Sequence, residues 1–188
     1  MRIVQLLGTI GAAALLAAGV AMPVNSAEMA NSQLKDASGK AVGDVDLMQT
    51  PSGVLIKLQI KGLTPGEHAF HVHAVGNCEA PFESAGPHFN PGNHKHGMLS
   101  GEGHAGDMPN LYAPQSGELS VEVVNSAISL EQGKPNSVFD NDGSALVIHA
   151  KADDYKTDPA GNAGDRIACG VIQQSGAATV GSGFSPKK

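Results

Sequence analysis

Hydrophobic and polar residues alternate along much of the chain with the two-residue period of a β-strand. In the clearest run, residues 54–61, Val54, Ile56 and Leu58 fall on one face. Comparable runs, bounded by turn-forming Gly and Pro, predict about eight strands. They lie near residues 30–36, 41–50, 54–61, 67–75, 110–114, 118–124, 144–150 and 166–172. Because no helical periodicity follows the first residues, the pattern predicts an all-β domain, an antiparallel sandwich or barrel.

Composition supports this prediction and excludes one class of partner. Gly (24) and Pro (11) make up about a fifth of the 188 residues, as expected for many turns and not for a helical bundle. The length fits one domain with its own core. The formal net charge is −6 and no Lys- or Arg-rich run occurs, so nucleic acid is excluded as a partner.

The first 27 residues have the features of a secretory signal peptide. Arg2 precedes an apolar stretch, and small residues lead up to Ala27, where cleavage would occur. The apolar stretch is short and interrupted by Gly, which argues against a stable membrane anchor. We therefore expect a leader at 1–27, a folded domain at 28–173 and a flexible polar tail at 174–188. The product would be exported, to the periplasm or alternatively out of the cell.

Two cysteines, Cys78 and Cys169, are the whole cysteine content. An even number in an exported chain favours one disulfide, with two unrelated buried thiols as the alternative. Such a bridge would pin an internal loop to the last predicted strand. In the entropy model of disulfides, closing a loop this long restricts the unfolded chain by roughly 4 to 5 kcal/mol.

Two intervals between the predicted strands, Gly76–Pro109 and Lys151–Asp165, are too long for simple turns. Loops of this length in a compact domain are usually functional. The eight histidines lie in the first interval or in the strands next to the two intervals. His68 and His94 have turn-forming or polar neighbours, so we expect both to be ordinary exposed side chains.

The other histidines form two candidate sets of metal ligands. Strand alternation places His71 and His73 on one face, and His149 ends another apolar run at a strand edge where it could join them. Three or four imidazoles without a carboxylate suit copper. Three imidazoles and one carboxylate on a single loop suit a structural zinc; these are His88, His96, His104 and Asp107.

Several motifs together carry a resemblance to a known family. They are Gly66–His73, Ser84–Pro91, Lys95–Gly97, His104–Asp107, Leu146–Asp154 and Gly161–Ile172, and they extend over about residues 30–172. With these motifs the sequence resembles the Cu/Zn superoxide dismutases. Cys78, shortly after His73, and the segment 79–83 are similar to the exported bacterial members.

The resemblance implies a fold, an activity and two metals. The fold would be an eight-stranded antiparallel Greek-key β-barrel or sandwich with two long functional loops. The substrate would be superoxide, converted to dioxygen and hydrogen peroxide with one copper and one zinc per chain. Copper would be held by His71, His73, His88 and His149, and zinc by His88, His96, His104 and Asp107. His88 would then bridge the two metals.

Further residues acquire roles from the resemblance. Asp153 matches the family's carboxylate that links a copper histidine to a zinc histidine. Arg166 matches the arginine beside the copper channel, and together with His88 it would be catalytic. Lys156 and Thr157 match the substrate-guiding pair only ambiguously.

Two other classes of function remain open at this point. One is a non-catalytic exported copper- or zinc-binding protein, or a chaperone-like relative on the same fold, which would be expected to lack copper ligands or the channel arginine. The other is a zinc hydrolase, which needs three protein ligands, an open water position and a general base. The oligomeric state is also open, with a homodimer among the states that the resemblance allows.

Overall fold

Antiparallel β-strands form nearly all the regular structure in residues 26–99 and 101–179, the part of the chain that the computed structural model describes. The predicted leader at 1–27 lies almost wholly outside these residues. One short 3₁₀ helix, η1 (Glu83–Ala85), is present, and no helix in the described part is long and apolar enough to cross a membrane. The strands are β1 (Ser26–Asp36), β2 (Ala41–Thr50), β3 (Gly53–Ile60), β4 (Gly66–His68), β5 (Phe70–His73), β6 (Leu111–Ala113), β7 (Leu119–Asn125), β8 (Ala145–His149), β9 (Arg166–Val171) and β10 (Gln173–Thr179).

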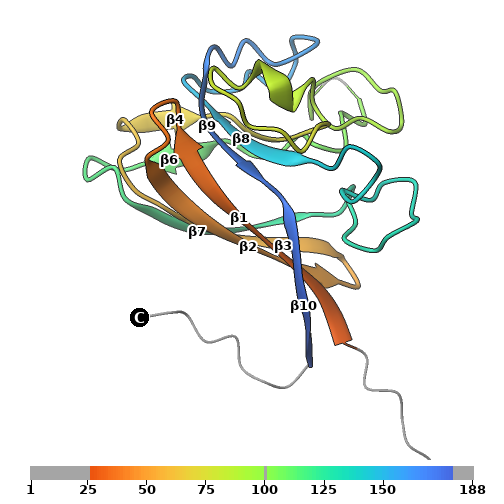
Figure 1. Ribbon diagram of the computed structural model, residues 1–188. Helices are drawn as coiled ribbons and strands as arrows, with labels where there is room; N and C mark the ends of the chain where they lie inside the picture. Colours follow the sequence, from red (N-terminus) through yellow and green to blue (C-terminus); the bar gives the residue numbers. More distant parts are fainter. Residues whose placement is uncertain (1–25, 100, 180–188) are drawn as a thin grey trace, which may run out of the picture.

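Eight of these strands form one curled sheet (Figure 1), in the order β5-β8-β9-β1-β2-β3-β7, with β10 also paired to β1. The other two, β4 and β6, form a small separate sheet. β4 runs into β5 at one edge of the large sheet, and β6 leads through a turn into β7 at the other edge. The small sheet therefore connects the two edges, and the predicted all-β antiparallel class is confirmed.

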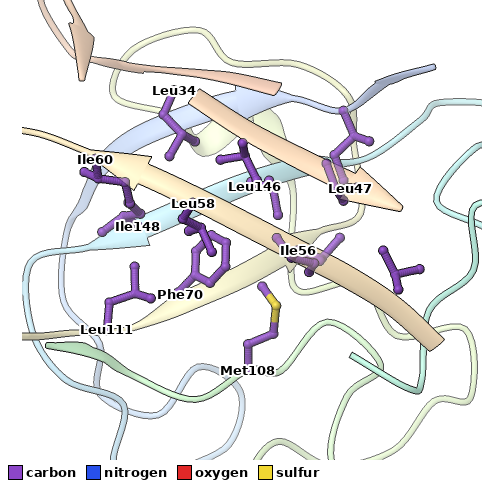
Figure 2. Close-up of a cluster of buried hydrophobic side chains, with 14 of the residues drawn as sticks. Leu34, Leu47, Ile56, Leu58, Ile60, Phe70, Met108, Leu111, Leu146 and Ile148 are labelled. Atoms are coloured by element: carbon purple, nitrogen blue, oxygen red, sulfur yellow. The ribbon is translucent and has the colours of Figure 1, made fainter. Parts of the chain in front are cut away.

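The core lies where the alternation predicts it. On β3 every second side chain is buried. Figure 2 shows three of them, Ile56, Leu58 and Ile60, in one cluster with Phe70 and Ile148. Complete burial of such a side chain contributes about 1.5 to 3 kcal/mol through the hydrophobic effect. Successive side chains of a strand point to opposite faces of the sheet, so the buried face of β3 can be predicted from the alternation in its own residues.

The single strand predicted at 67–75 is instead two strands. β4 pairs with β6, whereas β5 pairs with β8. Ala69, between them, donates its N–H to Lys151 O at 2.8 Å and accepts a hydrogen bond from the His149 N–H at 2.9 Å. The strand with which the chain pairs therefore changes at Ala69, from β6 to β8, although the alternation of polar and apolar residues continues through this position.

The C-terminal end of the fold extends further than predicted. Gln173–Thr179 forms β10 and pairs with β1, so the flexible tail predicted at 174–188 is wrong for residues 174–179. Small polar residues give little hydrophobic signal. Main-chain hydrogen bonds to β1 order this segment instead.

A third long connection, residues 126–144 between β7 and β8, is one that the sequence pattern does not single out. Its Ile128, Leu130 and Val138 are buried in the main core. Gln49 on β2 accepts a hydrogen bond from the Leu130 N–H through its side-chain oxygen, at 2.8 Å. This segment therefore packs onto the strands and covers part of the core.

The two predicted functional loops lie at one end of the barrel, the upper part of Figure 1. We call residues 74–110 the first loop and residues 150–165 the second loop. The His96 N–H in the first loop donates to Asp158 Oδ1 in the second at 2.8 Å. The Tyr155 carbonyl accepts another hydrogen bond from the first loop at 3.1 Å. The side chains of both loops are thereby gathered in one place.

The predicted disulfide is present. Cys78 in the first loop is bonded to Cys169 on β9, with Cα atoms 5.7 Å apart and a sequence separation of 91. Beside the bridge, Phe82, Ala85 and Val147 pack in a small second core. The start of the first loop is therefore fixed against β9.

Replacing both cysteines by serine should destabilise the domain. Removing a native disulfide that closes a long loop costs about 2 to 5 kcal/mol, which denaturant titration would measure as a lower free energy of unfolding. Amide hydrogens of residues 79–88 should also exchange faster, because the first loop loses its attachment to β9. In the unreduced wild-type protein, a thiol titration under denaturing conditions should find no free thiol, and two reactive thiols would show that the bridge does not form.

Candidate metal centre

The free edge of β5 is covered by two short segments of the first loop, and these carry candidate ligands. Val72, at the centre of β5, donates its N–H to Gly106 O at 2.9 Å and accepts a hydrogen bond from the Phe89 N–H at 2.8 Å. A Cβ at Gly106 would collide with the Val72 carbonyl, so this approach requires glycine. The pairing sets His73 opposite His88, and His71 opposite Asp107.

In the first ligand group, the four-histidine group, one ring nitrogen from each residue lies within 4.8 Å of those of the others. Its members come from β5, the first loop and the end of β8. They meet because β5 and β8 are neighbours in the sheet. The Nε2 atoms of His73 and His149 are 3.4 Å apart. The group comprises four buried residues, His71, His73, His88 and His149.

The second group, the histidine–aspartate group, lies entirely on the first loop and comprises His88, His96, His104 and Asp107. The Nδ1 atoms of its three histidines, in that order, lie 2.9, 3.1 and 3.4 Å from Asp107 Oδ1. Asp107 Oδ2 accepts hydrogen bonds from the backbone N–H groups of Gly97 and His104, which hold the carboxylate in place. Three nitrogens and one oxygen converge, a donor set that suits zinc.

His88 belongs to both groups, and its two ring nitrogens have different surroundings. Nδ1 lies beside Asp107, whereas Nε2 is buried without a hydrogen-bond partner among the described residues. Nδ1 of His71 is in the same situation. Burying an unpaired polar atom costs free energy. Both atoms belong to the four-histidine group, and a cation bound there would satisfy them, so these residues fit a copper ion.

Burial favours the neutral form of three members of the four-histidine group, His71, His73 and His149. It is the largest cause of a pKa of about 4 for His71 and about 3 for His149, and it holds the pKa of His73 well below 6.5. The proximity of His88 adds to this lowering in all three residues. Neutral imidazole is the form that binds metal ions.

In the histidine–aspartate group, by contrast, His96 favours its protonated form. Burial would lower the pKa of His96, but hydrogen bonds and charges from Asp107 and Asp153 outweigh it and raise that pKa to about 9. For Asp107, burial alone would raise the pKa. Hydrogen bonds from His88, His96 and two backbone amides outweigh it and hold this pKa well below its usual value. Burial lowers the pKa of His104, but the carboxylates stabilise positive charge around His96, as a dication site requires.

Asp153, on the second loop, connects the two groups. Its Oδ2 accepts a hydrogen bond from His71 Nε2 at 2.7 Å, and its Oδ1 accepts one from His96 Nε2 at 3.0 Å. The side chain is only 1% exposed. Burial would raise its pKa, but the two histidines outweigh burial and lower it to about 2. A Cβ at Gly161 would collide with Asp153 Oδ1 and His96 Nε2, so glycine at 161 leaves room for this contact.

Replacing Asp153 by asparagine should weaken both ligand groups. The amide oxygen can accept from one histidine, but the NH2 group cannot accept from the other. Loss of such a partner typically costs about 10- to 100-fold in metal affinity, which competition with a chelator would measure for zinc and for copper. Asp165→Asn is the control, because it makes the same charge change at an exposed position of the same loop. Equal affinities in the two variants would contradict the connecting role.

Arg166, at the start of β9, is held by the first loop. Its Nη1 donates to Phe82 O at 2.6 Å and its Nη2 to Gly86 O at 2.8 Å. The Gly86 carbonyl also accepts from His73 Nδ1 at 2.9 Å, so the guanidinium and a histidine of the four-histidine group share one acceptor. The side chain is 16% exposed, and its carboxylate neighbour, at 3.7 Å, is Glu83.

Two histidines lie outside both groups. The prediction that His68 is exposed is wrong, because its side chain is buried and its ring nitrogens each lie 2.8 Å from a carbonyl oxygen, those of His149 and Thr64. Nothing in the local sequence shows that β4 turns inward at this point. His94 is exposed as predicted, and its Nδ1 lies 2.9 Å from Glu102 Oε2.

Two aspartates that were not among the predicted site residues, Asp154 and Asp158, organise the second loop. Asp154 Oδ1 accepts the N–H groups of Lys156 and Thr157, and its Oδ2 accepts from Thr157 Oγ1 at 2.6 Å. Asp158 Oδ1 accepts the His96 N–H. An Asp placed two or three residues before polar turn residues is the signal for the first of these. Lys156 and Thr157 are exposed, and their part in guiding substrate stays a prediction.

Comparison with known proteins agrees with this geometry. The sequence model of the family described as copper/zinc superoxide dismutase (SODC) matches residues 41–172. Superoxide dismutase [Cu-Zn] 2 of Aquifex aeolicus is 54% identical over 77% of this chain and 86% of its own length. Superoxide dismutase [Cu-Zn] of Caulobacter vibrioides is 44% identical over 77% of this chain and 85% of its own length.

Solved structures show the same similarity. A double mutant of a SOD-like protein from Bacillus subtilis superposes with a TM-score of 0.74 at 41% identity, covering 76% of this chain and 96% of that one. The Cu/Zn superoxide dismutase from Brucella abortus gives a TM-score of 0.65 at 33% identity, covering 78% and 100%. Because sequence and fold agree over most of the described residues, the chain belongs to the copper/zinc superoxide dismutase family.

Proposed function

We propose that this chain dismutates superoxide, 2 O2•− + 2 H+ → O2 + H2O2, with the four-histidine group as its copper site and the histidine–aspartate group as its zinc site. The observation that carries this assignment is His88, which has one ring nitrogen in each group and whose Nε2 is buried without a hydrogen-bond partner among the described residues. Copper, when bound, would supply the one-electron redox chemistry, and zinc would be structural because it has no redox chemistry.

His88 would act as the proton carrier. Nδ1 stays in the histidine–aspartate group beside Asp107, while Nε2 is free to take up a proton in one half of the cycle and to give it to the product peroxide in the other. Asp153 keeps the His71 ring in place during both halves through its hydrogen bond to Nε2.

Arg166 would attract and orient the anionic substrate. Its guanidinium carries a permanent charge, and its position next to the Gly86 carbonyl brings that charge close to His73. Two of its donors are engaged by carbonyl oxygens, so the fork is held in one orientation. The remaining exposed surface is where superoxide would approach.

Metal analysis combined with a superoxide-consumption assay tests the function. The protein, oxidised and supplied with both metals, should hold one copper and one zinc per chain and consume superoxide catalytically. Binding of both metals without turnover would instead favour the exported copper- or zinc-binding protein. Hydrolytic activity with zinc alone would favour the zinc hydrolase.

Export to the periplasm and a homodimeric state are further parts of this proposal. The disulfide supports an oxidising compartment, and relatives of the chain include extracellular members. Cell fractionation should find the mature chain, cleaved near Ala27, in the periplasmic fraction. Sedimentation of the purified protein would determine whether it is a dimer.

A further inference from the structure

A cavity of about 360 Å³ opens beside the histidine–aspartate group, and we call it the zinc-side cavity. The first loop supplies most of its wall, and residues 127 and 135–136 of the third connection supply the rest. His104 lines it and, at 9%, is the most exposed member of the histidine–aspartate group. The cavity therefore connects one member of that group, His104, with solvent.

Two further groups of the kind that bind zinc line the same cavity. His94 and Glu102 both belong to its wall, and His94 Nδ1 lies 2.9 Å from Glu102 Oε2. Their side chains are 36% and 82% exposed. Imidazole and carboxylate are ordinary zinc ligands, and both side chains are more exposed to solvent than that of His104, at 7%.

The position of His94 is built into the loop. Asn90 Oδ1 accepts the His94 N–H at 3.0 Å, and Asn90 Nδ2 donates to the His94 carbonyl at 2.9 Å. Glycine at position 92 leaves space for the ring, because a Cβ there would lie 2.6 Å from His94 Nε2. Asn90 thus holds the His94 backbone at the cavity, independently of Glu102.

We propose that His94 and Glu102 form an entry site for zinc, from which the ion passes through the zinc-side cavity to His104 and the rest of the histidine–aspartate group. This inference rests on the proposed zinc assignment of that group. A cation must exchange water for protein ligands stepwise, and two ligands at the surface begin that exchange. Two ligands hold zinc less tightly than four, so the entry site passes the ion on.

An entry site has a kinetic signature that a loop-holding ion pair lacks. It lies on the path in both directions, so removing it slows uptake and release by the same factor and leaves the dissociation constant unchanged. A pair that only holds the loop in place acts on the bound state, so its removal speeds release and weakens affinity.

The experiment measures zinc uptake by the metal-free full-length mature protein and zinc release from the loaded protein to excess chelator. His94→Gln removes the metal ligand and keeps a hydrogen-bond donor for Glu102, and Glu102→Gln removes the carboxylate. Both should slow uptake and release about three- to tenfold, less than the 10- to 10³-fold by which charge-lined clefts raise association rates. Glu131→Gln is the control, because it removes an exposed carboxylate that pairs with Lys134 on the neighbouring connection.

Three results would overturn the inference. Unchanged rates in both variants would show that zinc enters elsewhere, and faster release with weaker affinity would show that the pair only holds the loop. Equal slowing in Glu131→Gln would show a general charge effect. If the wild-type protein itself binds no zinc, the zinc assignment of the histidine–aspartate group fails, which the other results do not imply.

Discussion

Replacing His88 by alanine should abolish superoxide dismutation and separate the two metal sites. The variant loses the imidazole ring that both groups share, and with it the proposed proton carrier; loss of a general acid–base group alone costs about 10²- to 10⁴-fold in rate. In the wild-type protein, removing zinc should change the visible spectrum of bound copper, because the proposed copper and zinc sites share the His88 ring. In His88→Ala that spectrum should not respond to zinc.

The control for this experiment is His68→Ala. It also removes a buried imidazole, but from outside both ligand groups. We expect it to lower stability through the lost contacts with the His149 and Thr64 carbonyls and to keep the response of copper to zinc. If zinc removal alters the copper spectrum equally in the wild type and in His88→Ala, His88 does not bridge the metals.

Replacing Arg166 by glutamate should lower kcat/KM by at least about tenfold, within the 10- to 10³-fold range of electrostatic steering in general. The chain is acidic, with a net charge of −6, so its overall field repels superoxide. Arg166 then has to supply local positive potential. Wild-type activity should fall as salt rises, and this fall should shrink or reverse in the variant. Steady-state assays across ionic strength measure both effects.

The hydrogen bonds of Arg166 predict a further effect of Arg166→Glu, on the copper site. Because the Gly86 carbonyl accepts from both Arg166 and His73, the copper spectrum should shift slightly while the copper content stays at one per chain. Arg166→Lys should be intermediate, since it keeps the charge but cannot bond both loop carbonyls with a planar fork. Lys40→Glu makes the same charge reversal in the exposed turn between β1 and β2 and should leave the rate near the wild-type value. If Arg166→Glu behaves like Lys40→Glu with both metals bound, Lys156 becomes the next candidate.

Much of the fold follows from local features of the sequence. Alternation in β3 and in the flanking strands is visible because successive side chains of a strand face opposite sides, and one side must be buried. The two long loops were visible as intervals without such alternation. The candidate ligands could be predicted from their chemistry, because three histidines and an aspartate at short spacing on one loop form a typical set of zinc ligands. Their assignment to two metals came from the resemblance of the motifs to the family. The even cysteine count predicted the disulfide that the structure contains.

Contacts between distant segments decided the rest. The break at Ala69, the pairing of β10 with β1 and the burial of His68 depend on partners far away in the chain, which residue patterns do not encode. The sequence by itself determined which side chains can bind metals. Only the tertiary structure decided which ring nitrogens are left unpaired, that Asp153 hydrogen-bonds one histidine of each group, and that Arg166 is held by loop carbonyls, because orientation follows from packing of the two loops on β5, β8 and β9.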